Sequence, residues 1–359
     1  MTANPEEQVW HTDTADLAPK SGDGVLAFLA ECRATVVPVL REAVDTLPPP
    51  VRRVAGYHFG WLDEHGRPVA DDNGGKMIRP ALTLLSARAV GGGVEDAVPA
   101  AASVELVHNF SLLHDDIIDG DRTRRHRLTA WAAFGVPAAV LAGDALWALA
   151  LRLLTDGDGA TSAQTVRTMT LTLCRLIDGQ SADTDFPLRH RVSISEVEDM
   201  AAGKTAAVMG CASALGALAG GGDLAQVSAL QRMGENLGMA FQVVDDLLGI
   251  WGDPGSVGKP VGSDLTNRKK SFPVVAALAS GTDAAAELAS LYRFERPLTD
   301  AEAARAADLV EAAGGRAWAL REAERYAQAA RHALAEIDAA PDVTADLSAL
   351  TALITGRDH

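Results

Sequence analysis

The feature that most constrains this chain is a helical spacing of apolar residues that recurs along almost its whole length. From Gly24 onward, apolar residues return every three or four positions in segment after segment, beginning with GVLAFLAECRATVVPVLREAVDTL at 24–47. Three consecutive prolines, Pro48, Pro49 and Pro50, are expected to end that first helix. No stretch alternates apolar and polar residues as a half-buried strand would. The sequence therefore predicts an all-α protein.

The same spacing predicts further helices and a single domain. The predicted helices are 81–90, 98–119, 137–154, 163–183, 194–218, 225–251, 283–292, 301–314 and 316–337. The connectors contain Gly and Pro, and none is long and polar enough to divide the chain. Residues 1–22 are polar and aperiodic, so we expect a flexible tail at 1–22 and one helical domain at 23–359.

Composition narrows the class of partner. The formal net charge of −16 disfavours nucleic acid and anionic membrane as general partners, because both repel an acidic surface. The N-terminus lacks the basic start and apolar run of a signal peptide, and no window reaches 18 charge-free apolar residues. Cys32, Cys174 and Cys211 are far apart and are interpreted as core thiols in a reducing compartment. We expect a soluble, cytoplasmic protein without an integral membrane segment.

Two acidic clusters end apolar helices. In SLLHDDIIDGDRTRR at 111–125, Asp115 and Asp119 are four residues apart, so their carboxylates lie one turn apart on one helix face. His108 falls on the same face two turns earlier. The second cluster is Asp245 and Asp246 in FQVVDDLLGIW. Carboxylates so placed repel one another unless a cation lies between them, and hard oxygen ligands suit Mg²⁺ that also contacts phosphate.

Basic residues on predicted loops and helix ends accompany both clusters. They are Lys76 and Arg79 in DNGGKMIRP, Arg122, Arg124 and Arg125, Lys204 in AAGKTAAVMG, and Lys259, Lys269 and Lys270. Such positions suit phosphate binding. Together with the apolar helices, they suggest a site that ionises an allylic diphosphate while excluding water from the resulting cation.

These blocks resemble the trans-isoprenyl diphosphate synthase, or polyprenyl synthetase, family from about Gly74 to Pro273. GGKMIRP resembles the family's GGK-x-x-RP, and ELVHNFSLLHDDIIDGDRTRR resembles its first aspartate-rich motif with the paired arginines. GQSAD, GKTAAV, FQVVDD and GKPVGSDLTNRKKSFP are similar to the later blocks. Six blocks in the family's order make a specific signal. The implied fold is an all-α bundle with a deep central cavity, usually a homodimer.

The resemblance also implies a role for each matching residue. Isopentenyl diphosphate is expected to bind Lys76, Arg79, His108 and Arg125. The allylic diphosphate is expected to bind Arg124, Lys204, Lys259 and Lys269. Mg²⁺, about three ions per site, is expected on Asp115, Asp119 and Asp245, supported by Asp116 and Asp246. Thr205 and Gln242 are expected beside the reacting allyl group. Asp121 and Asp183 lie near the site and are interpreted as supporting or structural residues.

The implied reaction is head-to-tail elongation of an allylic diphosphate (dimethylallyl, geranyl or farnesyl) with isopentenyl diphosphate. The residues before the first motif suggest the product length. Ser111, four before Asp115, leaves the predicted pocket open, whereas Phe110 forms a wall, a combination that resembles the geranylgeranyl (C20) type.

Two departures from the family pattern stand out. The second motif is DDLLG, so Gly249 occupies its third acidic position, and Asp253 is the next carboxylate along the chain. In the loop after the paired arginines, His126 replaces the family's Gly and Leu128 replaces its Pro.

Three alternative functions follow from the same residues. A class I terpene cyclase shares the implied fold and fits Gly249, but it needs no second diphosphate site of the kind that Lys76, Arg79 and His108 provide. A metal-dependent phosphohydrolase fits the His114–Asp115 pair, but lacks the further His and Asp ligands. A non-catalytic partner subunit would not need both acidic clusters. Of the adjacent lysines, Lys269 is predicted to bind phosphate and Lys270 to be solvated.

Overall fold

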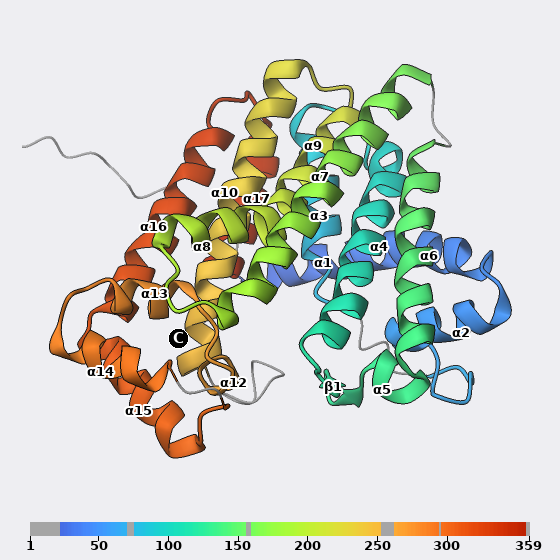
Figure 1. Cartoon of the computed structure of the whole chain (residues 1–359). Coiled ribbons are helices and arrows are strands. Elements are labelled where there is room, and N and C mark those ends of the chain that lie inside the picture. The colour runs from blue at the N-terminus through green and yellow to red at the C-terminus, as the bar shows by residue number, and fades with distance from the viewer. Residues whose placement is uncertain (1–21, 70–74, 156–158, 253–261, 294–295, 357–359) are drawn as a thin grey trace, which may run out of the picture.

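The computed structural model describes residues 22–69, 75–155, 159–252, 262–293 and 296–356. Its long helices run side by side, with α4 and α6 on one side of the bundle and α10 and α16 on the other (Figure 1). In chain order the helices are α1 (Gly22–Asp45), α2 (Pro49–His58), α3 (Ile78–Ala89), α4 (Val94–Ile118), α5 (Ala130–Phe134), α6 (Val136–Thr155), α7 (Gly159–Asp185), α8 (Ile194–Ala201), α9 (Ala207–Ala219), α10 (Leu224–Trp251), α12 (Ser263–Thr266), α13 (Phe272–Leu278), α14 (Asp283–Leu291), α15 (Asp300–Ala312), α16 (Gly315–Leu334) and α17 (Pro341–Thr355).

The all-α prediction is confirmed. The strands of the described residues are β1 (Thr123–Arg124) and β2 (Arg127–Leu128), which pair antiparallel as a short hairpin. A 3-10 turn, Phe186–Leu188, follows α7. The first helix ends at Asp45, just before the three prolines, as predicted, and Pro49 begins α2. Helices α2, α5, α12, α13 and α17 were not among the segments predicted from spacing.

The core forms where α10 packs between α9 and α16, and where α4 packs against α6, α3 and α9. Glycine allows two of these helix connectors to touch. A Cβ at Gly92 would lie 2.2 Å from the Cα of Gly220, so the α3–α4 and α9–α10 connectors meet backbone to backbone. This close contact fixes the C-terminal ends of α3 and α9 and the N-terminal ends of α4 and α10 relative to one another.

A π turn at Ala202–Ala206 joins α8 to α9 and contains Lys204 and Thr205. The expectation that Lys204 lies at a helix end or on a loop is therefore wrong, because the helix continues through it. A Cβ at Gly179 would come within 2.3 Å of the Lys204 backbone nitrogen, so α7 packs directly against the turn. Such turns inside helices are frequently found at functional sites.

Two helical segments, Val136–Thr155 and Ile194–Ala219, are long and apolar enough to cross a membrane by length and composition. Ile194–Ala219 is 83% buried inside the protein, as expected of a core helix, whereas Val136–Thr155 is 39% buried. Core helices of water-soluble proteins share this length and composition.

The three cysteines are free thiols. Cys32 and Cys211 are buried, as predicted, but Cys174 is exposed on α7, so the interpretation of Cys174 as a core thiol is wrong. The predicted tail at 1–22 lies outside the described residues except for Gly22.

Candidate functional site

A cavity of about 400 Å³ lies between the C-terminal parts of α4 and α10. Figure 1 shows these two ends at the lower end of the bundle, near β1 and α12. Its wall brings together most of the predicted site residues. They are Arg79, His108, Ser111, Asp115, Asp119, Arg124, Arg125, Lys204, Thr205, Gln242, Asp245, Asp246 and Lys269.

The first acidic cluster has the predicted geometry. Asp119 caps the C-terminus of α4, and its backbone N–H donates to the carbonyl of Asp115 at 2.8 Å. The helical turn therefore continues through both aspartates, and both line the cavity. Burial raises the pKa of Asp115, so its ionised form needs a nearby cation.

Lys204 supplies one such cation. Its ammonium donates to Asp183 at 2.6 Å and lies 3.9 Å from the Asp115 carboxylate. Burial alone would lower the pKa of Lys204, but Asp115 and Asp183 outweigh this effect and raise it. Lys204 thus stays protonated in the cavity, within reach of an anionic ligand.

Lys269 forms the matching contact at the other aspartate. Its ammonium lies 3.8 Å from Asp119. Burial would lower its pKa, but Asp264, Asp183 and Asp119 raise it overall. The two lysines therefore place fixed positive charge beside the two aspartates, an arrangement that suits a diphosphate bound between them.

The second acidic cluster forms the opposite wall. Asp246 is buried, and its carboxylate accepts hydrogen bonds from Gln242 at 2.8 Å and from the backbone N–H of Phe272 at 2.9 Å. Burial raises the pKa of Asp246 to about 7. Asp246 thus orients Gln242, whose carbonyl accepts a hydrogen bond of 2.6 Å from Thr205. Thr205, Gln242 and Asp246 form one hydrogen-bonded chain along the cavity wall.

A basic part of the cavity wall contains Arg79, His108 and Arg125. Burial and the neighbouring Arg79 and Arg125 lower the pKa of His108 well below its usual range. His108 is therefore neutral and can take part as a hydrogen-bonding group beside two permanent cations. Such a wall suits a second anionic group, separate from the one near Lys204.

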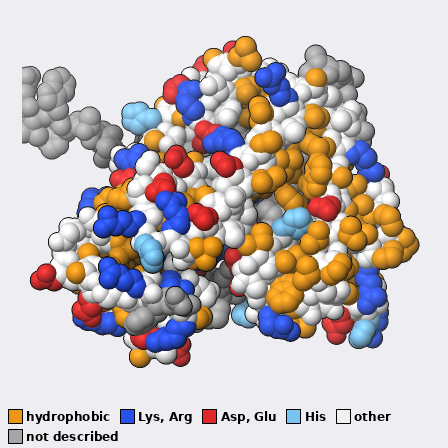
Figure 2. All heavy atoms as spheres, viewed as in Figure 1, with side chains coloured by type: hydrophobic (Ala, Val, Ile, Leu, Met, Phe, Trp, Pro, Cys, Tyr) orange, Lys and Arg blue, Asp and Glu red, His pale blue; other side chains and the backbone are white. Residues whose placement is uncertain are grey.

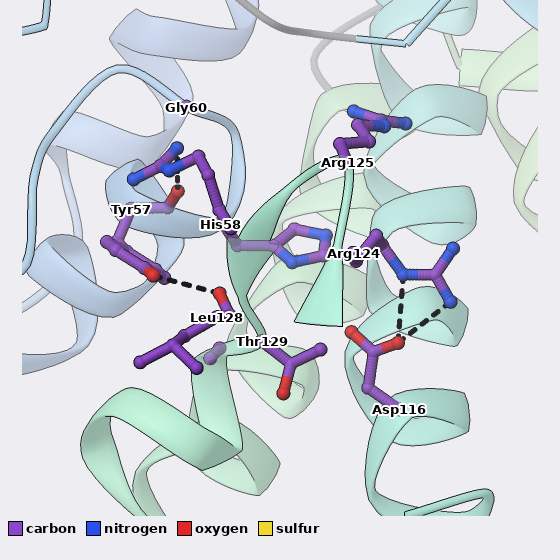
Figure 3. A pocket seen from close by; sticks show the side chains of 10 residues that line it. Tyr57, His58, Gly60, Asp116, Arg124, Arg125, Leu128 and Thr129 are labelled. Carbon is purple, nitrogen blue, oxygen red and sulfur yellow. Dashed lines mark hydrogen bonds and ion pairs between the residues drawn. The ribbon is translucent and has the colours of Figure 1, made fainter. Parts of the chain in front are cut away.

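The β1–β2 hairpin carries two of the arginines. Its loop, Arg125–His126, has positive φ at both residues (50° and 61°), as a type I′ turn requires. Arg124 donates to Asp116 at 2.8 Å, and Figure 3 shows this contact. In this structure Asp116 therefore holds Arg124 in place, while its support of Mg²⁺ stays a prediction.

The hairpin is fastened to the end of α2. The Tyr57 hydroxyl donates to the carbonyl of Leu128 at 2.8 Å, while Arg127 donates to the carbonyls of Tyr57 and Leu62. The guanidinium of Arg127 also covers the Tyr57 ring at 4.3 Å. These contacts fix the position of the arginines that line the cavity.

His58 lies next to the same hairpin, with Arg124 beside its ring and Arg125 above it in Figure 3. Burial, together with these two arginines, lowers the pKa of His58 to about 3. A small cavity of about 30 Å³, roughly the volume of one water molecule, adjoins its ring. His58 is therefore a neutral group that supports the arginine pair without adding charge.

An apolar groove of about 490 Å³ extends from the catalytic cavity between α4 and α7. Ser111, Asp115 and Leu176 line both. Phe110 forms part of the groove wall, and its ring meets the His114 ring edge-on at 4.9 Å between centroids. As expected from their spacing, Ser111 lies at the open junction and Phe110 forms a wall.

A few predicted residues lie elsewhere. Lys76 is exposed and outside the cavity wall. Its segment nevertheless adjoins the site, because Arg33 donates to the carbonyl of Gly75, and a Cβ at Gly75 would lie 2.9 Å from the Arg125 guanidinium. Lys259 and Asp253 lie outside the described residues. Lys270, predicted to be solvated, is only 5% exposed, so that prediction is wrong.

Other wall residues were not predicted as site residues, namely Leu112, Leu176, Met200, Phe241, Gly249, Asp264, Lys270 and Ser271. Asp183, interpreted only as supporting or structural, also lines the cavity. Asp183 and Asp264 both lie in sequence blocks that resemble the family, since Asp183 ends GQSAD and Asp264 lies in GSDL. These blocks could have indicated both carboxylates as site residues.

The donor set fits Mg²⁺ bound together with phosphate. Among the described residues, no group of three or more His, Cys, Asp or Glu side chains could hold a metal ion by itself. The carboxylates instead lie in two groups across the cavity. Mg²⁺ commonly uses one or two protein carboxylates and takes its other ligands from water and phosphate. Asp115 and Asp245, one from each of these groups, therefore suit a metal–diphosphate complex better than a bare ion.

Comparisons with known proteins agree with this geometry. The sequence pattern described as "Polyprenyl synthetase" matches residues 61–310. A geranylgeranyl diphosphate synthase of Mycobacterium tuberculosis is 46% identical over 347 residues, which cover 96% of this chain and 98% of that protein. A (2E,6E)-farnesyl diphosphate synthase of Mycobacterium bovis is 44% identical and covers 92% and 93%. The crystal structure of a polyprenyl synthetase from Streptomyces coelicolor A3(2) superposes with a TM-score of 0.87 at 46% identity, covering 92% and 99%.

Proposed function

Because this chain belongs to the polyprenyl synthetase family and is therefore a prenyltransferase, we propose that it elongates an allylic diphosphate with isopentenyl diphosphate to geranylgeranyl diphosphate. The observation that carries the C20 assignment is the groove that opens beside Ser111, with Phe110 in its wall. The relatives are named for both C20 and C15 products, so product length rests on this pocket.

Two separate sets of cations support two diphosphate sites. Lys204 and Lys269 lie beside Asp115 and Asp119, where the allylic diphosphate would bind. Arg79, His108 and Arg125 form the other wall, where isopentenyl diphosphate would bind. A terpene cyclase has no use for this second set, so the basic wall favours the synthase.

We propose that Mg²⁺ binds Asp115, Asp119 and Asp245 together with the allylic diphosphate and supplies electrophilic stabilisation of the departing diphosphate. Lys204 and Lys269 hold the phosphate oxygens as the C1–O bond breaks and its electron pair leaves with the diphosphate. Thr205 and Gln242 present oxygen atoms beside the resulting allylic cation. The isopentenyl double bond then forms the new bond to C1, and the released diphosphate takes the proton that is lost from C2.

The exposed apolar side chains of α6 and α7 support a homodimer. Val136, Leu141, Leu171 and Ile177 are 44–60% exposed, and Figure 2 shows hydrophobic side chains gathered over this side of the molecule. A second copy would cover them. Replacement of Leu141 and Leu171 by Glu should halve the mass measured by light scattering, and a wild-type monomer would contradict the dimer. The free thiols support a cytoplasmic location.

Product analysis tests the function directly. Purified protein is incubated with isopentenyl diphosphate, Mg²⁺ and either dimethylallyl, geranyl or farnesyl diphosphate, and the dephosphorylated products are identified by mass. A C20 alcohol is expected from all three. A C15 product would contradict the chain length alone, whereas a cyclic hydrocarbon from a single allylic substrate would contradict the synthase itself.

A further inference from the structure

A second cavity of about 830 Å³ adjoins the catalytic cavity and shares Lys270 with it. It lies between α13, α14 and the segment that precedes α8. We name it the basic groove. None of the roles derived above involves it.

The basic groove has an excess of positive charge in an acidic protein. Arg189, Arg191, Arg293 and Lys270 line it together with one carboxylate, Glu196, which pairs with Arg189 at 2.5 Å. In the described part of the chain, Arg191, Arg293 and Lys270 have no carboxylate within ion-pair distance. Figure 2 shows Lys, Arg and His side chains gathered over the region where Figure 1 places α13 and α14.

Lys270 is the buried member of this set. It is 5% exposed, and its ammonium lies 4.5 Å from the centre of the Tyr292 ring. Burial lowers the pKa of Lys270 to about 8. A buried cation without a carboxylate partner is costly unless an anion binds beside it. The buried ammonium of Lys270 therefore suits the binding of an anionic group in the basic groove.

The remaining lining is apolar. Val275, Leu278 and Ala279 come from α13, Ala289 from α14, and Val192 from the segment before α8. The basic groove thus offers cationic side chains for a phosphate group and aliphatic side chains for a hydrocarbon chain.

We propose that the basic groove binds a prenyl diphosphate at a second, non-catalytic site and thereby lowers activity. The two sites are connected through adjacent residues, since Lys270 faces the groove while Lys269 lies beside Asp119. The Tyr292 hydroxyl also donates to the carbonyl of Lys269 at 3.4 Å. A ligand that repositions Lys270 would therefore displace Lys269.

The test counts binding sites on the full chain. Titration calorimetry with farnesyl thiolodiphosphate, which does not ionise readily, gives the number of equivalents bound per protomer. The variant Arg191→Gln/Arg293→Gln should bind one equivalent fewer than the wild type and lose inhibition by excess farnesyl diphosphate, while its initial rate at low substrate is retained. Arg167→Gln/Arg321→Gln, on exposed positions of α7 and α16 outside the basic groove, removes the same two charges and is the control.

Equal stoichiometry in the wild type and the double variant would overturn the second site. Equal affinity of the groove for inorganic diphosphate would overturn the requirement for a hydrocarbon chain. A wild type that binds no analogue at all would contradict the proposed function as well, so the two failures are distinguishable.

A separate observation concerns Gly249, the position where the second motif lacks its third carboxylate. A Cβ at Gly249 would lie 2.4 Å from a carboxylate oxygen of Asp264. Asp264 lines the catalytic cavity together with Asp245 and Asp246. Its carboxylate therefore occupies the space that a side chain at position 249 would need.

The surrounding backbone holds Asp264 in this position. The carbonyl of Asp264 accepts a hydrogen bond from the backbone N–H of Lys269 at 2.8 Å, and Gly262 donates to the carbonyl of Gly249 at 3.1 Å. The structure assigns to Asp264 the role of the missing third carboxylate on the metal side of the cavity. This assignment rests on the proposed Mg²⁺ site.

Metal binding, measured without turnover, tests the assignment. Electron paramagnetic resonance of Mn²⁺ titrated with methylenediphosphonate and the full chain should show affinity about 10- to 100-fold weaker in Asp264→Ala. The double variant Gly249→Asp/Asp264→Ala should regain Mn²⁺ affinity, because the new side chain at position 249 on α10 would then supply the carboxylate that position 264 no longer provides. Asp144→Ala, on exposed α6, is the control.

Unchanged Mn²⁺ affinity in Asp264→Ala, or no recovery in a folded double variant, would overturn the assignment. If the wild type itself binds no Mn²⁺ with the diphosphonate, the proposed metal site fails with it.

Discussion

The imidazole of His114 lies against Gly143 so closely that a methyl group at position 143 would come within 2.3 Å of its Nε2 atom. The His114 ring also contacts Phe110 edge-on, and both line the apolar groove. Helix α6, none of whose residues lines the catalytic cavity, thereby sets the position of a groove residue.

Gly143→Ala should shorten the product. The added methyl group would push the His114 ring toward Phe110 and narrow the groove, so the C15 share of the products should rise. Mass analysis of the dephosphorylated alcohols measures this share. Ala148→Ser, on the exposed face of the same helix, should leave the distribution unchanged; a C20 product from Gly143→Ala would refute the argument.

Phe110→Ala should lengthen the product, because the largest side chain in the groove wall is removed. The variant is also expected to lose about 3 kcal/mol of stability, as buried Phe→Ala changes commonly do. Phe59→Ala, in the core away from the groove, controls for destabilisation. If chain length stays the same in a folded Phe110→Ala protein, the end of the pocket lies elsewhere.

Asp115→Asn should reduce kcat by at least about 100-fold, since it removes a metal ligand and a partner of Lys204. Its melting temperature should not fall, because burial disfavours the ionised form of Asp115 in the folded protein. Steady-state kinetics and thermal denaturation check the two expectations. Activity close to that of the wild type would contradict the metal assignment.

Tyr57→Phe should raise KM for isopentenyl diphosphate about fivefold while kcat changes little. The variant loses only the hydrogen bond to Leu128, which is worth about 1 kcal/mol, and loosens the hairpin that carries Arg125. Tyr326→Phe loses a similar bond, to Glu198, away from the cavity. An equal effect in both variants would show that the hairpin contact has no special role.

The buried His58 should make the free energy of unfolding sensitive to acid. Its pKa is about 3 in the folded protein and near 6.5 in the unfolded chain, so the unfolded chain binds the additional proton as pH falls below 6.5. Stability should therefore fall by about 2 kcal/mol between pH 6.5 and pH 5. His58→Gln should lose this part of the pH dependence in urea denaturation. The same slope in that variant would exclude His58 as its source.

Sequence spacing predicted the acidic end of α4 well, because Asp115 and Asp119 lie in one helix whose geometry follows from local periodicity. Lys204 was predicted as a site residue, but its π turn was not. That turn depends on the close packing of Gly179 against the Lys204 backbone, a contact between distant segments. Asp264 was not predicted either, since its position beside Gly249 arises from the path of a connector rather than from any motif spacing.

The π turn also influences where this gene can vary in length. A turn of this kind holds one residue more than the α-helical turn it replaces, so the helix before it and the helix after it keep their separate alignments with α7 and α10. Deletion of one residue within Ala202–Ala206 is therefore absorbed when the π turn becomes an α-helical turn, although Lys204 and Thr205 would move. Elsewhere in α8 or α9, a one-residue deletion would rotate the side chains on one side of it by about a quarter of a revolution relative to the other side. One-residue deletions should therefore be tolerated better within the turn than in the helices beside it.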